Sequence, residues 1–220
     1  MSRSMVDVLE ELDRAGAVLL KRHFVYTSGK HGSAYINLDP LFPNVGLVSQ
    51  LGNLLVKPFV GQVDTVIAPA TGGIVLSVLA ARALVDRGYP VAATWADKHD
   101  DGFVVERAGF AEHLRDKRVL VVEDLLNTGG SVEKVCREAE RHGGQLVGVS
   151  VICNRGSLTA DKLRVPRLEA LVSVSFEAIP ADECPLCESA VPIVVDIGHG
   201  AKYRIDHPGY AGGYVTMIGA

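Results

Sequence analysis

Short apolar runs alternate with amphipathic stretches through the middle of the chain. Runs of this length bounded by polar residues are typical of buried strands, and stretches with a helical repeat are typical of helices. The predicted strands are 63–68, 91–95, 119–122 and 146–153, and the predicted helices are 43–59, 74–87 and 132–142. Because strands alternate with helices, the fold class is predicted to be α/β, with a parallel sheet flanked by helices on both faces. Ligands of such sheets bind at the carboxyl ends of the strands.

The two ends of the chain follow other patterns. Apolar residues recur with helical spacing over 5–20, which predicts an amphipathic helix. Residues 24–26 and 35–38 are predicted to be short extended pieces around a polar turn. Further on, strand-like runs at 168–175 and 191–197 predict a tail that packs on the sheet edge or forms part of a hood.

The bulk properties set limits on size, partners and location. A chain of 220 residues that is 48% hydrophobic can bury one good core with a small appendage. One domain is therefore predicted, in which 1–42 form an N-terminal helix and hood segment, 43–155 a ligand-binding core and 156–220 a C-terminal extension. The net charge of −4 argues against nonspecific binding of nucleic acid. No run reaches the roughly 18 apolar residues of a membrane span, and the N-terminus lacks the apolar stretch of a signal peptide, so a cytoplasmic protein without a membrane partner is expected.

The strongest motif follows the apolar run Val119–Val122. Two acids, Glu123 and Asp124, come directly after this predicted strand, and Thr128–Ser131 open the next predicted helix. Hydroxyls, glycines that permit close backbone approach and the N–H groups of a first helical turn form a cradle for a phosphate monoester. The acids would repel that phosphate, so they are expected to bind ribose hydroxyls or a metal-loaded sugar. One loop can thus hold both ends of a ribose 5-phosphate.

Other phosphate-binding loops do not fit this spacing. A Walker A loop needs a lysine after its last glycine, and none follows Gly130; a dinucleotide fingerprint needs Gly-x-Gly-x-x-Gly, which is also absent here. An ordinary strand-to-helix turn with an N-cap explains one hydroxyl, but it does not explain two acids, two hydroxyls and two glycines in nine residues.

The segment Val119–Ser131 resembles the signature of the type I phosphoribosyltransferases, which use phosphoribosyl pyrophosphate (PRPP) and Mg²⁺. The resemblance implies that Glu123 and Asp124 contact the ribose 2- and 3-hydroxyls, that Asp124 stabilises positive charge at the sugar, and that Asn127–Ser131 wrap the 5-phosphate. Both acids are also candidate ligands of a Mg²⁺ ion that binds through PRPP. The implied PRPP-binding residues are Glu123, Asp124, Leu125, Leu126, Asn127, Thr128, Gly129, Gly130 and Ser131.

Further segments, within roughly 9–155, resemble the orotate phosphoribosyltransferases among these enzymes. Phe24–Tyr35 is similar to their N-terminal hood, Ala68–Ile74 to their pyrophosphate loop, and Arg155 to an arginine that holds the carboxylate of orotate. Without the resemblance, the first segment can also be a surface hairpin and Arg155 can also solvate a loop. The implied pyrophosphate loop is Ala70, Thr71, Gly72 and Gly73, and the implied base-binding residues are Arg155, Thr128, Thr27, Lys30 and Tyr35.

The polar stretch between Asp97 and Lys117 is long for a plain connection. It is either a lid over a binding site or a simple surface β-hairpin, and the sequence leaves both open. By resemblance, Lys98 and Arg107 would neutralise the leaving pyrophosphate and His99 would donate a hydrogen bond or proton; His99 can equally be a solvated loop histidine. Together with the sugar-stabilising acid, these three are the implied catalytic residues. In the family this loop reaches the neighbouring subunit, so a homodimer is implied.

Two departures leave the identity of the base open. Thr27 stands where many orotate enzymes carry a lysine, and the predicted lid is poorer in basic residues than theirs. By resemblance, the chain is expected to transfer the phosphoribosyl group of PRPP to orotate in pyrimidine biosynthesis. The alternatives are transfer to a purine or to uracil, and a regulatory protein that binds PRPP or a nucleotide without catalysis.

Cys184-Pro-Leu-Cys187 could supply half of a tetrahedral zinc site, but the other half is not evident. His199 and His207 lie eight residues apart, outside the usual spacing, and the motif does not open a helix in a thioredoxin-like context. Four cysteines are too few for a disulfide framework in a chain of this size. The sequence therefore favours packed or partly exposed thiols at these positions, and a structural metal or redox role is the alternative.

Overall fold

The computed structural model describes residues 5–217 and divides into two compact units. The core unit consists of two segments, the chain up to Glu10 and Asp39–Val174. The small unit also consists of two segments, Glu11–Leu38 and the chain from Ser175 onward. The segment 156–220, predicted as one extension, thus contributes to both units.

The core unit is built on a six-stranded sheet with the order β5-β4-β3-β6-β7-β8. Neighbouring strands are parallel except β4 and β5, which are antiparallel. Its strands are β3 Thr65–Pro69, β4 Ala92–His99, β5 Gly102–Val104, β6 Arg118–Leu126, β7 Gln145–Asn154 and β8 Leu168–Ser173. The predicted α/β class with a mostly parallel sheet is confirmed.

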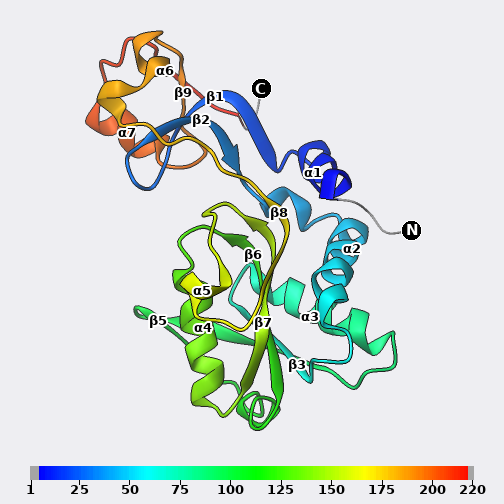
Figure 1. Cartoon of the computed structure of the whole chain (residues 1–220). Helices are drawn as coiled ribbons and strands as arrows, with labels where there is room; N and C mark the ends of the chain where they lie inside the picture. Colours follow the sequence, from blue (N-terminus) through cyan, green and yellow to red (C-terminus); the bar gives the residue numbers. More distant parts are fainter. Residues whose placement is uncertain (1–4, 218–220) are drawn as a thin grey trace. The chain divides into compact units, whose positions relative to one another are not determined.

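Helices cover both faces of this sheet. In Figure 1, α2 and α3 lie on one side and α4 lies on the other. The helices that contribute to the core unit are α1 Met5–Arg14, α2 Val45–Val56, α3 Gly73–Val85, α4 Gly130–Arg141 and α5 Ala160–Leu163, with 3-10 turns at Asp39–Leu41, Lys57–Phe59 and Ala111–His113. Among residues 5–217, no helix is both long enough and apolar enough to cross a membrane.

Side-chain alternation along β7 explains how one strand meets two helical layers. Val149 and Val151 are fully buried in the cluster that includes Val135 of α4. Ser150, between them, points to the other face, where its hydroxyl donates to the carbonyl of Leu55 in α2 at 2.8 Å. A strand buried on both faces therefore needs a nearly continuous apolar run, which is what its sequence shows.

The small unit holds a four-stranded sheet with the order β10-β9-β1-β2. Its apolar centre is Phe24, Tyr26 and Val194, with Tyr35 and Leu19 packed against them. The elements are β1 Val18–Val25, β2 His31–Ile36, β9 Ile193–Val194, β10 Tyr214–Val215, α6 Pro185–Glu188, α7 Gly200–Asp206 and a 3-10 turn at Ala181–Glu183.

Several predicted boundaries differ from the structure, two of them near the ends of the chain. The first helix ends at Arg14 instead of continuing to residue 20, because Gly16 adopts a left-handed conformation (φ 73°) that stops the helix, and β1 begins at Val18. The run predicted as a strand at 191–197 pairs only at Ile193 and Val194.

Glu138 ties the hairpin of β4 and β5 to α4. Its side chain is 7% exposed, and it accepts hydrogen bonds from the backbone N–H of Val105 (2.8 Å) and from the Arg141 guanidinium (2.7 Å). The Arg141 hydrogen bonds are the main reason that the pKa of Glu138 falls to about 2, and the Val105 N–H and Arg141's charge lower it further. The ionised carboxylate therefore stabilises the folded state above its ordinary pKa of 4.5, and this contribution is lost as the pH falls from there toward 2.

Glu138→Gln is expected to lower the free energy of unfolding at pH 7 by about 1.5–3 kcal/mol, because a charge-assisted network is removed. The difference from the wild type should narrow by about 1 kcal/mol between pH 7 and pH 4, as the wild-type carboxylate loses its advantage. Urea unfolding of the wild type and the variant at pH 7 and pH 4 measures the loss of unfolding free energy and its change with pH. A gap that stays constant with pH would contradict the assigned role.

Candidate functional site

Two acids lie on β6, one of the two central strands of the core-unit sheet. The sequence predicted that this strand ends at Val122, but β6 continues to Leu126. Its pairing with β7 extends past Glu123, which lies opposite Val151, to Leu126, which lies opposite Asn154. Glu123 and Asp124 are therefore held inside the sheet ladder instead of in a loop after it. This placement fixes the backbone of both acids.

Burial dominates the electrostatics of this pair. Glu123 is only 8% exposed, and burial, with a smaller contribution from the Asp124 charge, raises its pKa to about 9. Burial also raises the pKa of Asp124, although the N–H of Leu125 donates to its Oδ1 at 2.5 Å. Two buried acids side by side are stabilised by hydroxyl donors or by a cation. The arrangement thus fits a sugar diol or a hard divalent metal ion such as Mg²⁺.

The predicted phosphate cradle opens α4. Gly129 is the N-cap residue with φ 85°, and the N–H of Glu133 donates to its carbonyl at 2.9 Å. A Cβ at Gly129 would lie 2.6 Å from Cδ2 of Leu163, so the turn requires glycine for both space and conformation. Thr128 and Ser131 are exposed on either side of it. The N–H groups of the first turn are available to an anion there.

A second loop meets the acids from the neighbouring strand. Ala70–Gly73 connect β3 to α3, and the peptide bond between Ala70 and Thr71 is cis. A Cβ at Gly72 would lie 3.4 Å from Oδ2 of Asp124, and one at Gly73 would lie 3.5 Å from Oε1 of Glu123. The structure therefore places the predicted pyrophosphate loop against the carboxyl groups, and the phosphate cradle follows the same two acids along the chain.

Arg155 lies beside the phosphate cradle. The N–H groups of Arg155 and Gly156 both donate to the carbonyl of Leu126, at 2.8 and 3.1 Å. A Cβ at Gly156 would lie 1.7 Å from the carbonyl oxygen of Asn127, so the two loops are in backbone contact there. The Asn154 side chain accepts from the N–H of Leu158 and donates to its carbonyl.

Asn154 and Gly156 therefore position Arg155, and the sequence interpretation did not single them out. Their signal is the Asn-Arg-Gly order at the end of a buried strand: an amide can close the following turn, and only glycine permits so close a contact.

The first part of the predicted lid is a β-hairpin formed by the end of β4 and β5. Asp97 pairs with Val104 and His99 with Gly102, and Ala70 at the start of the second loop donates its N–H to Ala96 at 2.8 Å. The hairpin thus begins next to the predicted pyrophosphate loop.

The three basic residues of the predicted lid are placed differently. Lys98 and His99 are exposed near the tip of the hairpin, where Nδ1 of His99 lies 3.3 Å from Asp100. Arg107 instead forms two hydrogen bonds with Asp97, at 2.8 and 3.1 Å, and its guanidinium lies 5.1 Å from the Trp95 ring centre. Arg107 is thus engaged at the base of the hairpin.

The remaining base-binding candidates belong to the small unit. Thr27 and Lys30 are exposed in the turn between β1 and β2. Tyr35 is half-buried, with its ring 5.5 Å from Phe24 and stacked at 6.4 Å on Tyr26. The predicted polar turn is therefore present, and the structure adds that Tyr35 packs with Phe24 and Tyr26 in one aromatic cluster.

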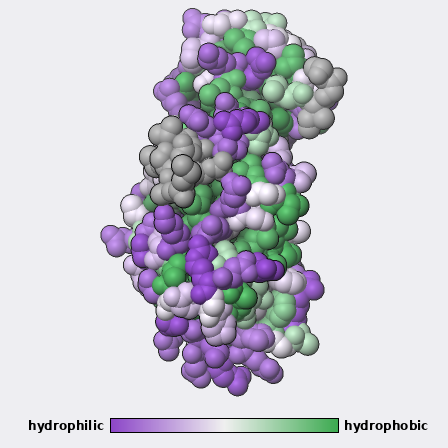
Figure 2. All heavy atoms as spheres, turned by 90° about the vertical axis from the view of Figure 1, so that its right-hand side faces the viewer, coloured by the Kyte–Doolittle hydropathy of each residue, from purple (hydrophilic) through white to green (hydrophobic). Residues whose placement is uncertain are grey.

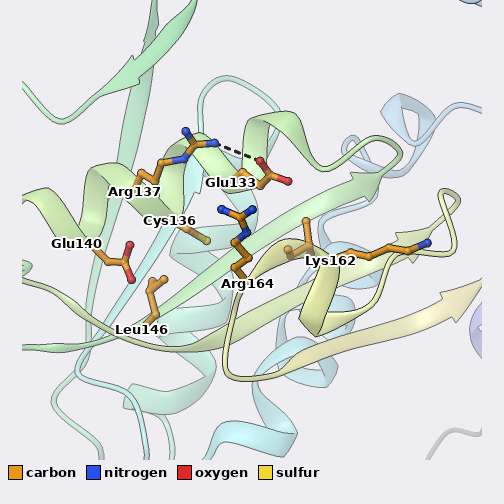
Figure 3. A pocket seen from close by; sticks show the side chains of 8 residues that line it. Glu133, Cys136, Arg137, Glu140, Leu146, Lys162 and Arg164 are labelled. Atoms are coloured by element: carbon orange, nitrogen blue, oxygen red, sulfur yellow. Dashed lines mark hydrogen bonds and ion pairs between the residues drawn. The ribbon is translucent and has the colours of Figure 1, made fainter.

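A pocket of about 360 Å³ between α4 and α5 is separate from these residues (Figure 3). Charged side chains surround it, and Arg137 forms an ion pair with Glu133 at 3.2 Å. The pKa of the Cys136 thiol in its wall is raised to about 12, chiefly by burial, so this cysteine is unreactive at neutral pH. None of the predicted site residues lines this pocket.

Comparisons with known proteins agree with this geometry. The family described as phosphoribosyl transferase domain matches residues 51–179. An orotate phosphoribosyltransferase of Thermus thermophilus is 40% identical over 189 residues, which cover 86% of this chain and 98% of that relative.

Two solved structures share the fold. The orotate phosphoribosyltransferase of Mycobacterium tuberculosis, in complex with 5-phospho-α-D-ribosyl 1-diphosphate, is 18% identical with a TM-score of 0.58, over 77% of this chain and 95% of its own. The adenine phosphoribosyltransferase of Rhodothermus marinus is 20% identical with a TM-score of 0.56, over 77% of this chain and 99% of its own. The fold is thus common to enzymes with different bases. The chain belongs to the phosphoribosyl transferase family and, within it, to the orotate phosphoribosyltransferases.

Gly129→Ala is expected to destabilise the protein by at least about 1–2 kcal/mol, because alanine is strained in the left-handed conformation and its Cβ meets Leu163. Gly130→Ala is the matched control, since a Cβ there would be 3.8 Å from the Thr128 hydroxyl, an ordinary contact, and the residue is already helical. Urea unfolding compares the two variants. Equal stabilities would show that the cradle does not depend on a left-handed residue.

Proposed function

We propose that the chain transfers the 5-phosphoribosyl group of PRPP to orotate, with formation of orotidine 5′-monophosphate and release of pyrophosphate. The observation that carries the proposal is the contact of the Ala70–Gly73 loop with Glu123 and Asp124, two acids that the phosphate cradle at the start of α4 follows directly along the chain. A ribose that carries a phosphate at one end and a pyrophosphate at the other presents the matching pattern of charge and hydroxyl groups. The choice of orotate is supported by the 40% identity with an orotate enzyme and by the position of Arg155.

Each part of the site has a role in this reaction. The first turn of α4, with Thr128 and Ser131, binds the 5-phosphate, and the loop at Thr71–Gly73 binds pyrophosphate through backbone N–H groups. Glu123 and Asp124 accept hydrogen bonds from the ribose hydroxyls. As bond breaking leaves positive charge on the sugar, the carboxyl of Asp124 stabilises it electrostatically.

Mg²⁺ is part of the proposal because the residues fit it. Glu123 and Asp124 are buried oxygen ligands with raised pKa values, and they would hold the ion together with oxygens of PRPP and water. When bound there, Mg²⁺ would neutralise part of the negative charge on pyrophosphate. The protein's own contribution is to fix both carboxyl groups on β6 before the substrate arrives.

The hairpin supplies the mobile cations of the proposed mechanism. Lys98 and His99 are exposed near its tip, where they can follow the departing pyrophosphate. Arg107 must first leave Asp97, and an exposed ion pair of this kind is weak enough to exchange partners. Closure of the hairpin over the sugar would also exclude water from the reacting carbon.

We further propose a cytoplasmic homodimer. All four cysteines are free thiols, which fits a reducing compartment. Figure 2 shows the side of the molecule that carries α2 and α3, where apolar patches lie between polar ones on the surface. Val75, Val78 and Val85 are each about half exposed along α3. Such a row of exposed apolar side chains is suited to contact with a second copy of the chain.

The proposed activity is tested by incubation of purified protein with PRPP, Mg²⁺ and one of orotate, uracil, adenine, guanine or hypoxanthine, with pyrophosphate release as the measurement. Among the five bases, only orotate is expected to give pyrophosphate release. Light scattering on the same preparation is expected to show a dimer. Asp124→Asn, prepared identically, should lose turnover, whereas Asp86→Asn on the exposed end of α3 should retain it. Turnover with a purine and none with orotate would refute the choice of base, and PRPP binding without release would indicate a regulator.

Arg155→Lys separates base recognition from PRPP recognition. Lysine keeps the charge but cannot form two parallel hydrogen bonds with a carboxylate, so the KM for orotate is expected to rise by about tenfold or more while the KM for PRPP changes little. Arg137→Lys, on the exposed face of α4, is the matched control and should leave both values unchanged. Equal increases in both KM values would mean that Arg155 acts on the whole site instead of on the base.

A further inference from the structure

Four side chains that can bind a metal ion converge in the small unit. His23 lies in β1 and His31 begins β2, whereas Cys184 directly precedes α6 and Cys187 lies in it. Their ligand atoms all lie within 4.8 Å of one another. His23, His31 and Cys184 are at most 3% exposed, and Cys187 is half-buried. The second half of a tetrahedral site, which the spacing along the chain did not reveal, is therefore the pair of histidines.

The distances in this cluster are close to those around a bound zinc ion. Nε2 of His23 lies 2.9 Å from Nδ1 of His31 and 3.7 Å from each sulfur, and the sulfur of Cys187 lies 3.2 Å from Nδ1 of His31. Tetrahedral zinc with its usual bond lengths separates neighbouring nitrogen and sulfur ligands by about 3.3–3.8 Å. The longest separation in the cluster is within 4.8 Å, so side-chain shifts that shorten it by about an ångström would place all four atoms around one ion.

The protonation of His23 also suits a ligand. Its Nδ1 lies 2.9 Å from the carbonyl oxygen of Val191, and a carbonyl only accepts, so Nδ1 carries the proton and the lone pair of Nε2 faces the cluster. The Tyr210 hydroxyl donates to the same carbonyl at 2.7 Å. Metal-binding histidines are commonly oriented by such a hydrogen bond from the other ring nitrogen.

The burial of the cluster also matters for its chemistry. Cysteine binds a metal ion as the thiolate, and in buried surroundings a divalent metal ion supplies the positive charge that stabilises the thiolate.

We propose that His23, His31, Cys184 and Cys187 bind one structural Zn²⁺ ion. Two sulfur and two imidazole nitrogen ligands in a closed tetrahedron are a set that zinc adopts in structural sites. Because four side chains fill the coordination sphere, the ion holds the fold and takes no part in catalysis.

The ion would join two chain segments that few backbone contacts hold. His23 is the residue of β1 that pairs with Ile193 of β9, and His31 forms an isolated bridge with Ile179. Both histidines thus stand where the N-terminal segment meets the C-terminal one, and both cysteines come from the C-terminal one. Small folds with a limited apolar core commonly gain stability from such a metal crosslink.

The site also brackets the turn that carries Thr27 and Lys30, since its two histidines flank that turn on β1 and β2. Zinc would therefore fix the ends of this turn. This last point rests on the proposed function, because these residues are candidates for base binding. The metal site itself does not, and its test uses metal content and thiol reactivity instead of turnover.

The first test is metal analysis of the full-length wild-type protein, purified under reducing conditions without chelators. Inductively coupled plasma mass spectrometry is expected to find about one zinc ion per chain. Removal of the metal with a chelator should lower the melting temperature and raise alkylation of Cys184 and Cys187 about tenfold or more, and added ZnCl₂ should reverse both effects. Peptide mass spectrometry identifies the alkylated cysteines.

Variants assign the ion to its ligands. Cys187→Ser and His31→Ala are expected to lower the zinc content to below about one fifth of the wild-type value, since loss of one ligand opens the site. Cys136→Ala, which removes a buried thiol of the core unit, is the matched control and should keep its zinc.

Four results would overturn the proposal. They are wild-type protein that contains no zinc and takes up none in a titration with ZnCl₂, iron in place of zinc, a disulfide between Cys184 and Cys187 under reducing conditions, and zinc retained in both ligand variants. Because the wild-type measurements need no variant, poor folding of a substituted protein does not decide the outcome.

Discussion

The burial of two neighbouring carboxyl groups on β6, one of the two central strands, is the constraint on which the site depends. In a folded sheet, Glu123 and Asp124 cannot move apart, and burial makes their joint ionisation unfavourable. Glycines at 72, 73 and 129 keep side chains out of the space around them or allow the sharp turn beside it. The surrounding loops therefore leave the two carboxyl groups accessible to a polar ligand.

The sequence was informative where function depends on neighbouring residues. A strand, two acids, two glycines and a helix start all lie within Val119–Ser131, so spacing alone indicates what they bind. The exact end of β6 was not predictable, because pairing with β7 extends the strand beyond its apolar run. The first helix was predicted too long, since Val18 and Leu19 fit a helical repeat as well as a strand, and only Gly16 marks the boundary.

Contacts between residues far apart along the chain could not be predicted from the sequence. His23 and Cys184 are brought together by the parallel pairing of β1 with β9, and no local pattern encodes that pairing. The same holds for Glu138, whose position on α4 indicates a solvent-facing acid until the N–H of Val105 is seen to bind it. Asn154 and Gly156 are intermediate cases, because their order around Arg155 carries a signal that becomes clear only once the adjoining loop is known.

The division of the chain between the two units has a consequence for its synthesis. The core unit consists mainly of one continuous segment, Asp39–Val174, whereas the small unit needs both the segment before it and the segment after it. On a ribosome, the sheet of the core unit can form while the last part is still untranslated. The N-terminal strands then remain without their partner β9, and His23 and His31 remain without the sulfur atoms beside them, until the segment from Ser175 onward has been synthesised. Assembly of the small unit therefore follows synthesis of the core unit.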